Sequence, residues 1–335
     1  MSSYKSKIKI ALLGLGRAGK FHIQSIQAIP DLRLIHVVDK DQNRAQEVGE
    51  SNECDYSTDY ESVLYRSDVD GVIIATPTHE HFKQVKDFLS AGIPVFSEKP
   101  LGYSIDEIDN CFDLAHKQNQ PLFVGFNRRF DPTFSSLAQQ VQSGCIGTPQ
   151  MIRVTSRDSP LPTMEYIKHS NGIFHDCIVH DFDMLRYITK EDPIEVYAVG
   201  SNFVEGIKEL NDYDNVLVSL KYESGLIASI DVNRFSAYGY DQRIEVFGNN
   251  GMLQAQNRSS TSTILSNDNG LIKPKIEYSF PTRYREAYRL ELESFLSTIR
   301  DSVEAPISHH DVKMSHILCE LGEKSCRNNR PERLR

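Results

Sequence analysis

A glycine-rich turn directly after the first strand-like run restricts the possible folds of this chain more than any other feature. The apolar run Ile8–Leu13 ends in Gly14-Leu15-Gly16-Arg17-Ala18-Gly19, and a helical pattern follows. Glycines at this spacing allow a tight turn, let the backbone approach a pyrophosphate and let the helix pack closely on the strand. The helix N-terminus adds N–H donors and positive partial charge for phosphates. The run therefore predicts a dinucleotide site formed by Gly14, Gly16, Arg17, Ala18 and Gly19.

The rest of residues 1–126 keeps this alternation of short apolar strands and amphipathic helices. Helical patterns include Lys20–Ala28 and Glu80–Ala91, the second ended by Gly92. Strand, helix, strand repeated in this way indicates a doubly wound parallel sheet, the Rossmann arrangement. The expected strands are Ile8–Leu13, Leu32–Val38, Gly71–Thr76, Pro94–Ser97 and Leu122–Gly125.

Residues 127–335 have a different pattern, which predicts a second α/β domain for substrate binding and oligomerisation. Helices are expected at Pro132–Ser143, from Asp176 to Ile188, and near Tyr284–Arg300 and His309–Lys324. Between them lie β-rich runs with one apolar face, and Glu223-Ser224-Gly225 is typical of a hairpin loop. These runs predict a large, open, mainly antiparallel sheet whose uncovered face favours a homodimer or homotetramer. The runs are Gln150–Arg157, Ile194–Asn202, Asn215–Tyr222, Leu226–Arg234 and Gln242–Phe247.

Composition excludes several classes of protein. The chain has 335 residues, a length that favours two domains, and a formal net charge of −9, which argues against nucleic-acid or anionic-membrane partners. Its polar N-terminus lacks the apolar region of a secretory signal, and no run is long enough to span a bilayer. The six cysteines are scattered without a Cys-x-x-Cys pair, which fits free thiols in a reducing cytoplasm.

Asp39, at the end of the second strand, bears on the choice of dinucleotide. A carboxylate at this position accepts hydrogen bonds from the adenosine ribose diol and repels a 2′-phosphate, so NAD is favoured over NADP. Lys40 could instead pair with such a phosphate, and Asp39 could simply cap the following helix, Asp41–Val48.

The strand ending at Thr76 continues into a loop that is expected to lie beside the cofactor, because strand C-termini of a parallel sheet face the ligand crevice. Thr76, Pro77 and His81 are therefore predicted cofactor-binding residues. His79 and His81 could suggest a zinc pair, but a spacing of two favours capping and packing, and no metal site is expected.

Four further segments make the chain similar to one known family over nearly its whole length. Glu98-Lys99-Pro100 follows a strand, and residues 125–131 read Gly-Phe-Asn-Arg-Arg-Phe-Asp; residues 172–183 read Gly-Ile-Phe-His-Asp-Cys-Ile-Val-His-Asp-Phe-Asp, and residues 237–243 read Ala-Tyr-Gly-Tyr-Asp-Gln-Arg. These segments resemble the glucose–fructose oxidoreductase and inositol dehydrogenase (Gfo/Idh/MocA) family, and the last two resemble its inositol 2-dehydrogenase branch. Asn171, His175 and Cys177 depart from the usual pattern of that branch.

The resemblance implies an NAD-dependent dehydrogenase that oxidises a ring hydroxyl of a cyclic polyol. It implies that Lys99, Asp176 and His180 are catalytic and that Glu98 contacts the cofactor. The first expected reaction is myo-inositol to 2-keto-myo-inositol (scyllo-inosose), with scyllo-inositol or a pyranose sugar as the alternative substrate. A dinucleotide-sensing regulator without catalysis and a zinc alcohol dehydrogenase are further alternatives.

The residue types themselves fit this chemistry. Asp176 and His180 are four apart, so on a helix they share one face, where a carboxylate can orient an imidazole that accepts an alcohol proton. The alternative is an ordinary ion pair on a helix surface. Lys99 precedes a proline at a strand end, which keeps it extended and suits an ammonium that stabilises alkoxide-like charge.

Weaker candidates for binding substrate hydroxyls lie elsewhere in the second half of the chain. Each desolvated polyol hydroxyl needs a hydrogen-bond partner, so a polyol site needs many donors and acceptors. The alternative is that the arginine ties the domains together and that the tyrosines pack on the sheet. These candidates are Arg128, Asp158, Tyr238 and Tyr240.

Overall fold

The computed structural model describes residues 6–334, which form two compact units. The first unit contains the described residues through Phe130 together with Arg285–Lys313. The second contains Asp131–Tyr284 and the described residues from Met314 onward. The chain thus passes from the first unit to the second after Phe130, and Arg285–Lys313, with helix α11 and the first turn of α12, belongs to the first unit again. This differs from a single division after residue 126.

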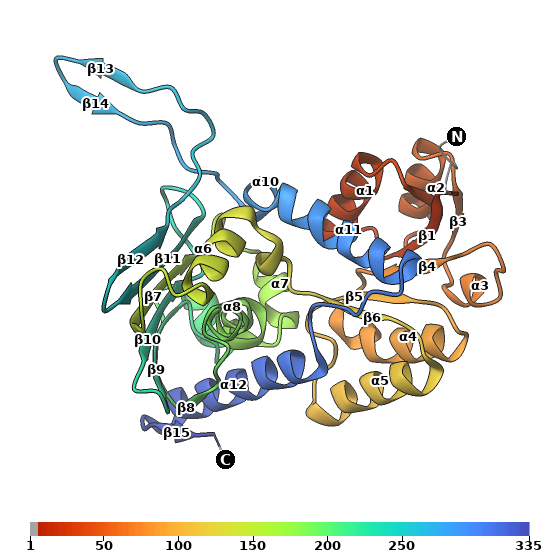
Figure 1. Cartoon of the computed structure of the whole chain (residues 1–335). Coiled ribbons are helices and arrows are strands. Elements are labelled where there is room, and N and C mark those ends of the chain that lie inside the picture. Colours follow the sequence, from red (N-terminus) through yellow and green to blue (C-terminus); the bar gives the residue numbers. More distant parts are fainter. Residues whose placement is uncertain (1–5, 335) are drawn as a thin grey trace. The chain divides into compact units, whose positions relative to one another are not determined.

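The first unit is built on a parallel six-stranded sheet with the strand order β3-β2-β1-β4-β5-β6. This is the doubly wound order, with a switch point between β1 and β4, and it confirms the predicted fold class. Helices α4 and α5 cover one face of the sheet and α1 and α11 the other (Figure 1). The strands are β1 (Ile8–Leu13), β2 (Leu32–Val38), β3 (Asp55–Ser57), β4 (Gly71–Ile74), β5 (Val95–Glu98) and β6 (Leu122–Gly125); the helices are α1 (Arg17–Ala28), α2 (Gln42–Ser51), α3 (Glu61–Leu64), α4 (Thr78–Ser90) and α5 (Ile105–Gln118).

Helix α11 (Arg285–Arg300) belongs to the first unit although it follows the second in sequence. Its apolar side packs on α1 and on the 3₁₀ helix Asn127–Phe130. Phe295 lies edge-on to the stacked rings of Phe96 and Phe123. Burial of this apolar stripe explains why the helix completes the first core.

The second unit contains a seven-stranded sheet with the order β12-β11-β7-β10-β9-β8-β15. Its pairs are antiparallel except β7–β10, so the predicted open and mainly antiparallel sheet is confirmed. The strands are β7 (Pro149–Arg157), β8 (Pro193–Ser201), β9 (Asn215–Tyr222), β10 (Ile227–Asn233), β11 (Asp241–Gly248), β12 (Gly251–Ala255) and β15 (Glu332–Arg333).

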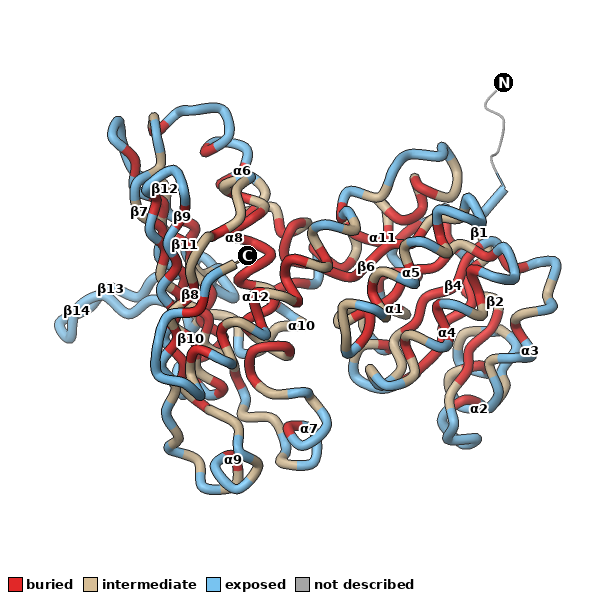
Figure 2. The backbone as a smooth tube through the Cα atoms, turned by 90° about the horizontal axis from the view of Figure 1, so that it is seen from below, coloured by how far each residue is buried: buried red, intermediate tan, exposed pale blue. Residues whose placement is uncertain are grey.

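The described helices cover one face of this sheet and leave the other open. Helices α6 (Pro132–Gln142), α8 (Val179–Thr189) and α12 (His309–Asn328) lie on that face, as both views show (Figures 1 and 2). The strands alternate buried and exposed residues, as an antiparallel sheet with one open face does; β9 is an example. A separate two-stranded hairpin, β13 (Leu265–Asn267) and β14 (Gly270–Ile272), projects from this unit.

The segment that carries Asp176 differs from the expected α-helix. Residues Phe174–Ile178 form a short π-helix that leads directly into α8. A π-turn holds one more residue than an α-turn and is found mostly at functional sites. Short helices α7 (Met164–His169), α9 (Glu205–Glu209) and α10 (Phe280–Arg283) complete the unit. Among the described helices, none has the length and apolarity needed to cross a membrane.

Candidate active site

The glycine-rich turn has the geometry of a phosphate-binding loop. Gly14 has φ +84°, and a Cβ there would lie 2.5 Å from the Ala75 carbonyl oxygen, so only glycine fits. A Cβ on Gly19 would lie 2.1 Å from the Gly14 carbonyl oxygen, which explains the close contact of helix and turn. At Gly16, the N-cap of α1, a Cβ would meet no atom of residues 6–334 within 4 Å. The N–H groups of this 12-residue helix can therefore be approached by a phosphate.

Asp39 lies against this turn. Its Oδ2 accepts a hydrogen bond from the Leu15 amide at 2.8 Å, and its Oδ1 accepts one from the Asp41 amide at 2.9 Å. The helix that follows is capped by Asp41 instead, whose Oδ1 accepts from Asn43 and Arg44 amides. Capping by Asp39 is therefore excluded, and its carboxylate is held at the end of β2 where a ribose diol would bind.

Two cations near Asp39 have different partners. Lys40 pairs with Glu80 across the first unit, with Nζ and Oε1 2.5 Å apart, and this contact lowers the pKa of Glu80. The half-exposed Arg44 lies nearer, with Nη1 3.3 Å from Asp39 Oδ1. Arg44 was not predicted from the sequence. The available signal was an arginine in the first turn of the helix that follows Asp39.

His81 is buried between two loops of the first unit. One ring nitrogen lies 2.8 Å from the Pro100 carbonyl oxygen and the other 2.8 Å from the Thr76 carbonyl oxygen. Burial lowers the pKa of His81, while the two carbonyls oppose this shift. The ring therefore joins the loop after β4 to the loop after β5. A direct contact of His81 with the cofactor remains a prediction, as it does for Thr76 and Pro77.

Glu98 and Lys99 end strand β5, at the same sheet edge as the glycine turn and Asp39. Glu98 Oε1 lies 2.8 Å from His22 Nε2, and the buried His22 ring packs edge-on against Phe96 and Tyr288. Helix α1 thus fixes the carboxylate that precedes Lys99. His22 is a further residue that the sequence reasoning did not identify.

Asp176 and His180 lie in the second unit, on the π-helix and on the first turn of α8. Both are partly buried. Asp176 Oδ1 accepts a hydrogen bond from the Tyr166 hydroxyl at 2.8 Å, and Oδ2 accepts one from Arg234 Nη1 at 2.9 Å. The Asp176 carboxylate therefore has a fixed orientation, which an ordinary surface ion pair does not.

The Arg234 side chain is fully buried and connects two carboxylates. Its Nη2 donates to Asp212 Oδ2 at 2.9 Å, while Asp212 Oδ1 accepts from the Ile173 amide at the start of the π-helix. Burial disfavours the charged form of Arg234, but the neighbouring Cys177, Asp176 and Asp212 raise its pKa. The charge of Asp176 and burial likewise raise the pKa of Tyr166. This network was not predicted from the sequence. Arg234 nevertheless continues the every-second-residue series of buried side chains Ala228, Ile230 and Val232.

The weaker substrate candidates have different surroundings. Asp158 follows β7, where its amide donates to the Asn233 carbonyl, so it lies beside the end of β10. Tyr240 is buried and packs against Phe280 and Tyr284, as the packing alternative expects. Arg128 is buried within the first unit, in the 3₁₀ helix. Substrate contacts by any of these residues remain predictions.

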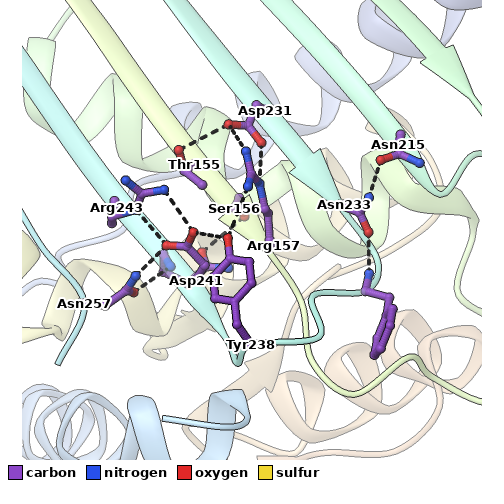
Figure 3. A network of polar contacts seen from close by, with 12 residues as sticks. Thr155, Ser156, Arg157, Asn215, Asp231, Asn233, Tyr238, Asp241, Arg243 and Asn257 are labelled. Carbon is purple, nitrogen blue, oxygen red and sulfur yellow. Dashed lines mark hydrogen bonds and ion pairs between the residues drawn. The ribbon is translucent and has the colours of Figure 1, made fainter. Parts of the chain in front are cut away.

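Tyr238 belongs to a polar network on the open face of the second sheet (Figure 3). Its hydroxyl donates to Asp241 Oδ2 at 2.6 Å and accepts from Arg157 Nη1 at 3.1 Å. Arg157 also forms a two-pronged ion pair with Asp231, at 2.8 and 3.0 Å. Tyr238, Asp231 and Arg157 line a shallow hollow of about 690 Å³, and neither Asp176 nor His180 is part of its lining.

No metal centre is found in the described part of the chain, where no three His, Cys, Asp or Glu side chains are grouped to hold an ion. His79 is largely exposed, and its Nε2 lies 3.4 Å from Glu80 Oε1; a capping or packing role of this residue remains a prediction. All six cysteines are free thiols.

Comparisons with known proteins fit this arrangement. Residues 8–126 match the model of an oxidoreductase family with an NAD-binding Rossmann fold, and residues 134–254 match the Gfo/Idh/MocA C-terminal domain. The chain belongs to the Gfo/Idh/MocA family. It is 36% identical to an inositol 2-dehydrogenase of Rhizobium meliloti, over 96% of this chain and 98% of the relative.

Solved structures of the Gfo/Idh/MocA family have the same fold. A myo-inositol dehydrogenase from Corynebacterium glutamicum superposes with a TM-score of 0.93 at 34% identity, over 98% of this chain and 99% of that one. A scyllo-inositol dehydrogenase from Lactobacillus casei, solved with NAD(H) and scyllo-inositol, gives 0.91 at 27% identity, over 98% and 99%. The chain is therefore an NAD-binding oxidoreductase, and the glycine turn and Asp39 provide a fitting site for the dinucleotide.

Proposed function

We propose that this protein oxidises one ring hydroxyl of a cyclic polyol, with NAD as hydride acceptor, and that myo-inositol is its substrate. The observation that carries the proposal is the fixed Asp176 carboxylate one turn before His180, in a chain whose other unit is an NAD-binding domain. The names of its relatives support the substrate class, since they are inositol dehydrogenases.

In the proposed reaction the substrate loses a hydride from carbon and a proton from oxygen, giving a ketone. Bound NAD supplies the hydride acceptor. Neutral His180 accepts the hydroxyl proton, and Asp176 stabilises the imidazolium that results. The Lys99 ammonium donates a hydrogen bond to the substrate oxygen, so its contact strengthens as negative charge develops there.

A second substrate, scyllo-inositol, is supported by the Lactobacillus casei enzyme with that ligand. The two inositols differ in the orientation of one hydroxyl, so the residues that accept or donate to that group decide between them. Arg128, Asp158, Tyr238 and Tyr240 are the proposed candidates.

The test is NAD reduction by the purified protein across a panel of inositols and pyranoses. We expect turnover with myo-inositol and a kcat/KM that rises with pH as His180 loses its proton. This rising part of the pH profile is called the limb below.

Asp176→Asn should slow oxidation sharply and move the limb to lower pH. His180→Gln should abolish both the limb and most of the activity. An undiminished His180→Gln enzyme with an unchanged limb would assign the proton to another group. A wild-type protein that binds NAD but oxidises no member of the panel would favour the regulator alternative.

We further propose that the open face of the second sheet joins copies of the chain into a homodimer or homotetramer. Large apolar side chains are half exposed on this sheet, including Val199, Leu217, Phe247 and Met252. An exposed apolar surface of this kind marks an interaction site.

A further inference from the structure

We propose that Arg234 is a positioning residue for the reaction: it clamps Asp176 in the orientation that His180 requires, and Asp212 balances its charge. The inference rests on the proposed function and names two residues that act through the Asp176–His180 pair. All the groups involved lie in the second unit.

Arg234 lies at a position where packing alone gives no reason for a charged side chain. The residue continues the buried side of β10, where its predecessors are Ala228, Ile230 and Val232, and its own side chain is 0% exposed. Burial of an arginine at such a position is costly unless carboxylates compensate it. A hydrophobic side chain would extend the core at lower cost, so the guanidinium is explained by what it holds.

The two terminal nitrogens of the Arg234 guanidinium hold two different carboxylates. Nη1 donates to Asp176 Oδ2 and Nη2 donates to Asp212 Oδ2, both at 2.9 Å. Asp212 Oδ1 also accepts from the Ile173 amide at 3.0 Å, so it anchors the first turn of the π-helix. One rigid guanidinium thus fixes both the start of this irregular segment and the carboxylate in its middle. Lysine, a point charge on a flexible stem, cannot form the same bridge.

Arg234 and Asp212 also contribute to the charge around Asp176. The groups around Asp176 are Tyr166 from α7, Cys177 from the π-helix, Arg234 after β10, Asp212 after α9 and His180 one turn along. Arg234 is the cation that contacts the Asp176 carboxylate directly, and Asp212 offsets its charge. Removing either should therefore change how strongly Asp176 stabilises a charged His180, in opposite directions.

The experiment compares three variants of the full-length protein in polyol oxidation. Asp212→Asn leaves Arg234 less compensated, so the kcat/KM limb should move to lower pH. Arg234→Gln combined with Asp212→Asn removes the nearer cation without leaving two unpaired carboxylates, so the limb should move to higher pH, each by roughly 0.5 to 1 unit. Arg234→Lys keeps the charge, so its limb should stay in place while kcat falls by about 10²-fold through misplacement of Asp176.

Arg283→Lys is the matched control. Arg283 is equally buried in the same unit and forms a two-pronged pair with Asp131, so its loss should lower stability to a similar degree. It should leave both the limb and kcat near the wild-type values. Limbs that stay in place or move in the same direction in the two charge variants would overturn the proposal, as would equal kcat losses in Arg234→Lys and Arg283→Lys.

A readout without turnover separates this inference from the proposed function. Titration of ¹³C-labelled histidine, with the His180 signal assigned by His180→Gln, reports the charge of the ring in the absence of any polyol. Opposite shifts of this titration in the two charge variants support the clamp even if no tested polyol is oxidised. Unshifted titrations overturn it even if the wild type oxidises myo-inositol.

Discussion

We expect Asp39 to decide the preference for NAD over NADP, because its contacts differ from those of the neighbouring carboxylate Asp41. It accepts from the Leu15 amide inside the glycine turn, while its neighbour Asp41 caps α2 and pairs with Arg44. Asp39→Ser removes both the partner for the ribose diol and the repulsion of a 2′-phosphate, and it removes one of the two carboxylates that pair with Arg44. We expect NAD to bind about tenfold more weakly and its advantage over NADP to narrow.

The measurement is kcat/KM for NAD and NADP in both enzymes. Asp41→Ser is the control, because serine still caps the helix and the variant also removes one carboxylate beside Arg44, but it leaves the contact of Asp39 with the glycine turn in place. A wild-type enzyme that prefers NADP would show that this assignment of Asp39 is wrong.

Lys99 is the residue for which binding and turnover should separate most clearly. Its proposed contact strengthens as charge develops on the substrate oxygen, so its loss falls on the transition state. Lys99→Ala should cut kcat by two orders of magnitude or more and leave the Kd for NAD within about twofold. Stopped-flow turnover and calorimetric NAD binding test this, with the exposed Lys117→Ala as control. Near-normal turnover would reduce Lys99 to a role in substrate placement.

At the scale of elements, the sequence predicted those strands and helices whose limits follow from the pattern of apolar residues. The limits of β1, β2 and β6 agree with expectation because each is an apolar run ended by a polar or glycine residue. The short strand β3 (Asp55–Ser57) was missed because its three residues are exposed or half buried and show no apolar alternation. Asp176 and His180 were identified from a resemblance, whereas the π-helix was not, because one extra residue in a turn leaves the apolar pattern nearly unchanged.

Long-range pairing explains the other residues that could not be predicted. Arg234 meets Asp176 and Asp212 only after β9 and β10 have paired, and His22 meets Glu98 only in the parallel sheet. No local spacing encodes these contacts. The one local signal was the position of Arg234, which directly follows β10 and would point to the same side as the buried residues of that strand.

Helix α11 carries an acid whose burial should make the stability of the fold depend on pH. Glu291 is 0% exposed, and burial together with the charge of Glu98 raises its pKa well above 4.5. Neither carboxyl oxygen has a hydrogen-bond partner within the described residues. Above pH 4.5 the unfolded chain releases this proton while the folded protein keeps it. Stability is therefore lost as pH rises, until the folded group also ionises.

Glu291→Gln imitates the neutral acid and removes this dependence. We expect the stability of the wild type to fall relative to the variant by up to about 1.4 kcal/mol per pH unit above 4.5, with the two converging near pH 4.5. Urea unfolding at pH 5, 6.5 and 8 measures the difference. Glu293→Gln, a partly exposed change on the same helix, is the control. Parallel pH profiles for wild type and Glu291→Gln would contradict the assignment.

At the scale of the whole molecule, one face of the second sheet has no covering layer formed by residues 6–334. Helices cover the opposite face, and the open face combines half-exposed apolar side chains with the partly exposed Arg157–Asp231 ion pair and with Arg243, which pairs with the buried Asp241. Opposite charges in rows beside apolar side chains suit a two-fold contact, in which the same patch meets itself. The hollow lined by Tyr238 lies on this surface, so assembly and the Tyr238 region are expected to be linked.

Charges placed on this face should separate the copies without unfolding them. Leu217 is 53% exposed and Phe247 47%, so lysine at both positions leaves the helix-covered core intact but opposes close contact of two such faces. We expect a lower molar mass by sedimentation at micromolar concentration, with an unchanged far-UV spectrum. Tyr65→Lys, 89% exposed in the first unit, should leave the mass unchanged.

If the double variant keeps the mass of the wild type, the open face is not where the copies meet. If the wild type is itself a monomer, the face binds no second copy at that concentration. Reduced mass with retained NAD binding would show that the cofactor unit works independently of assembly, because its glycine turn and Asp39 belong wholly to one chain.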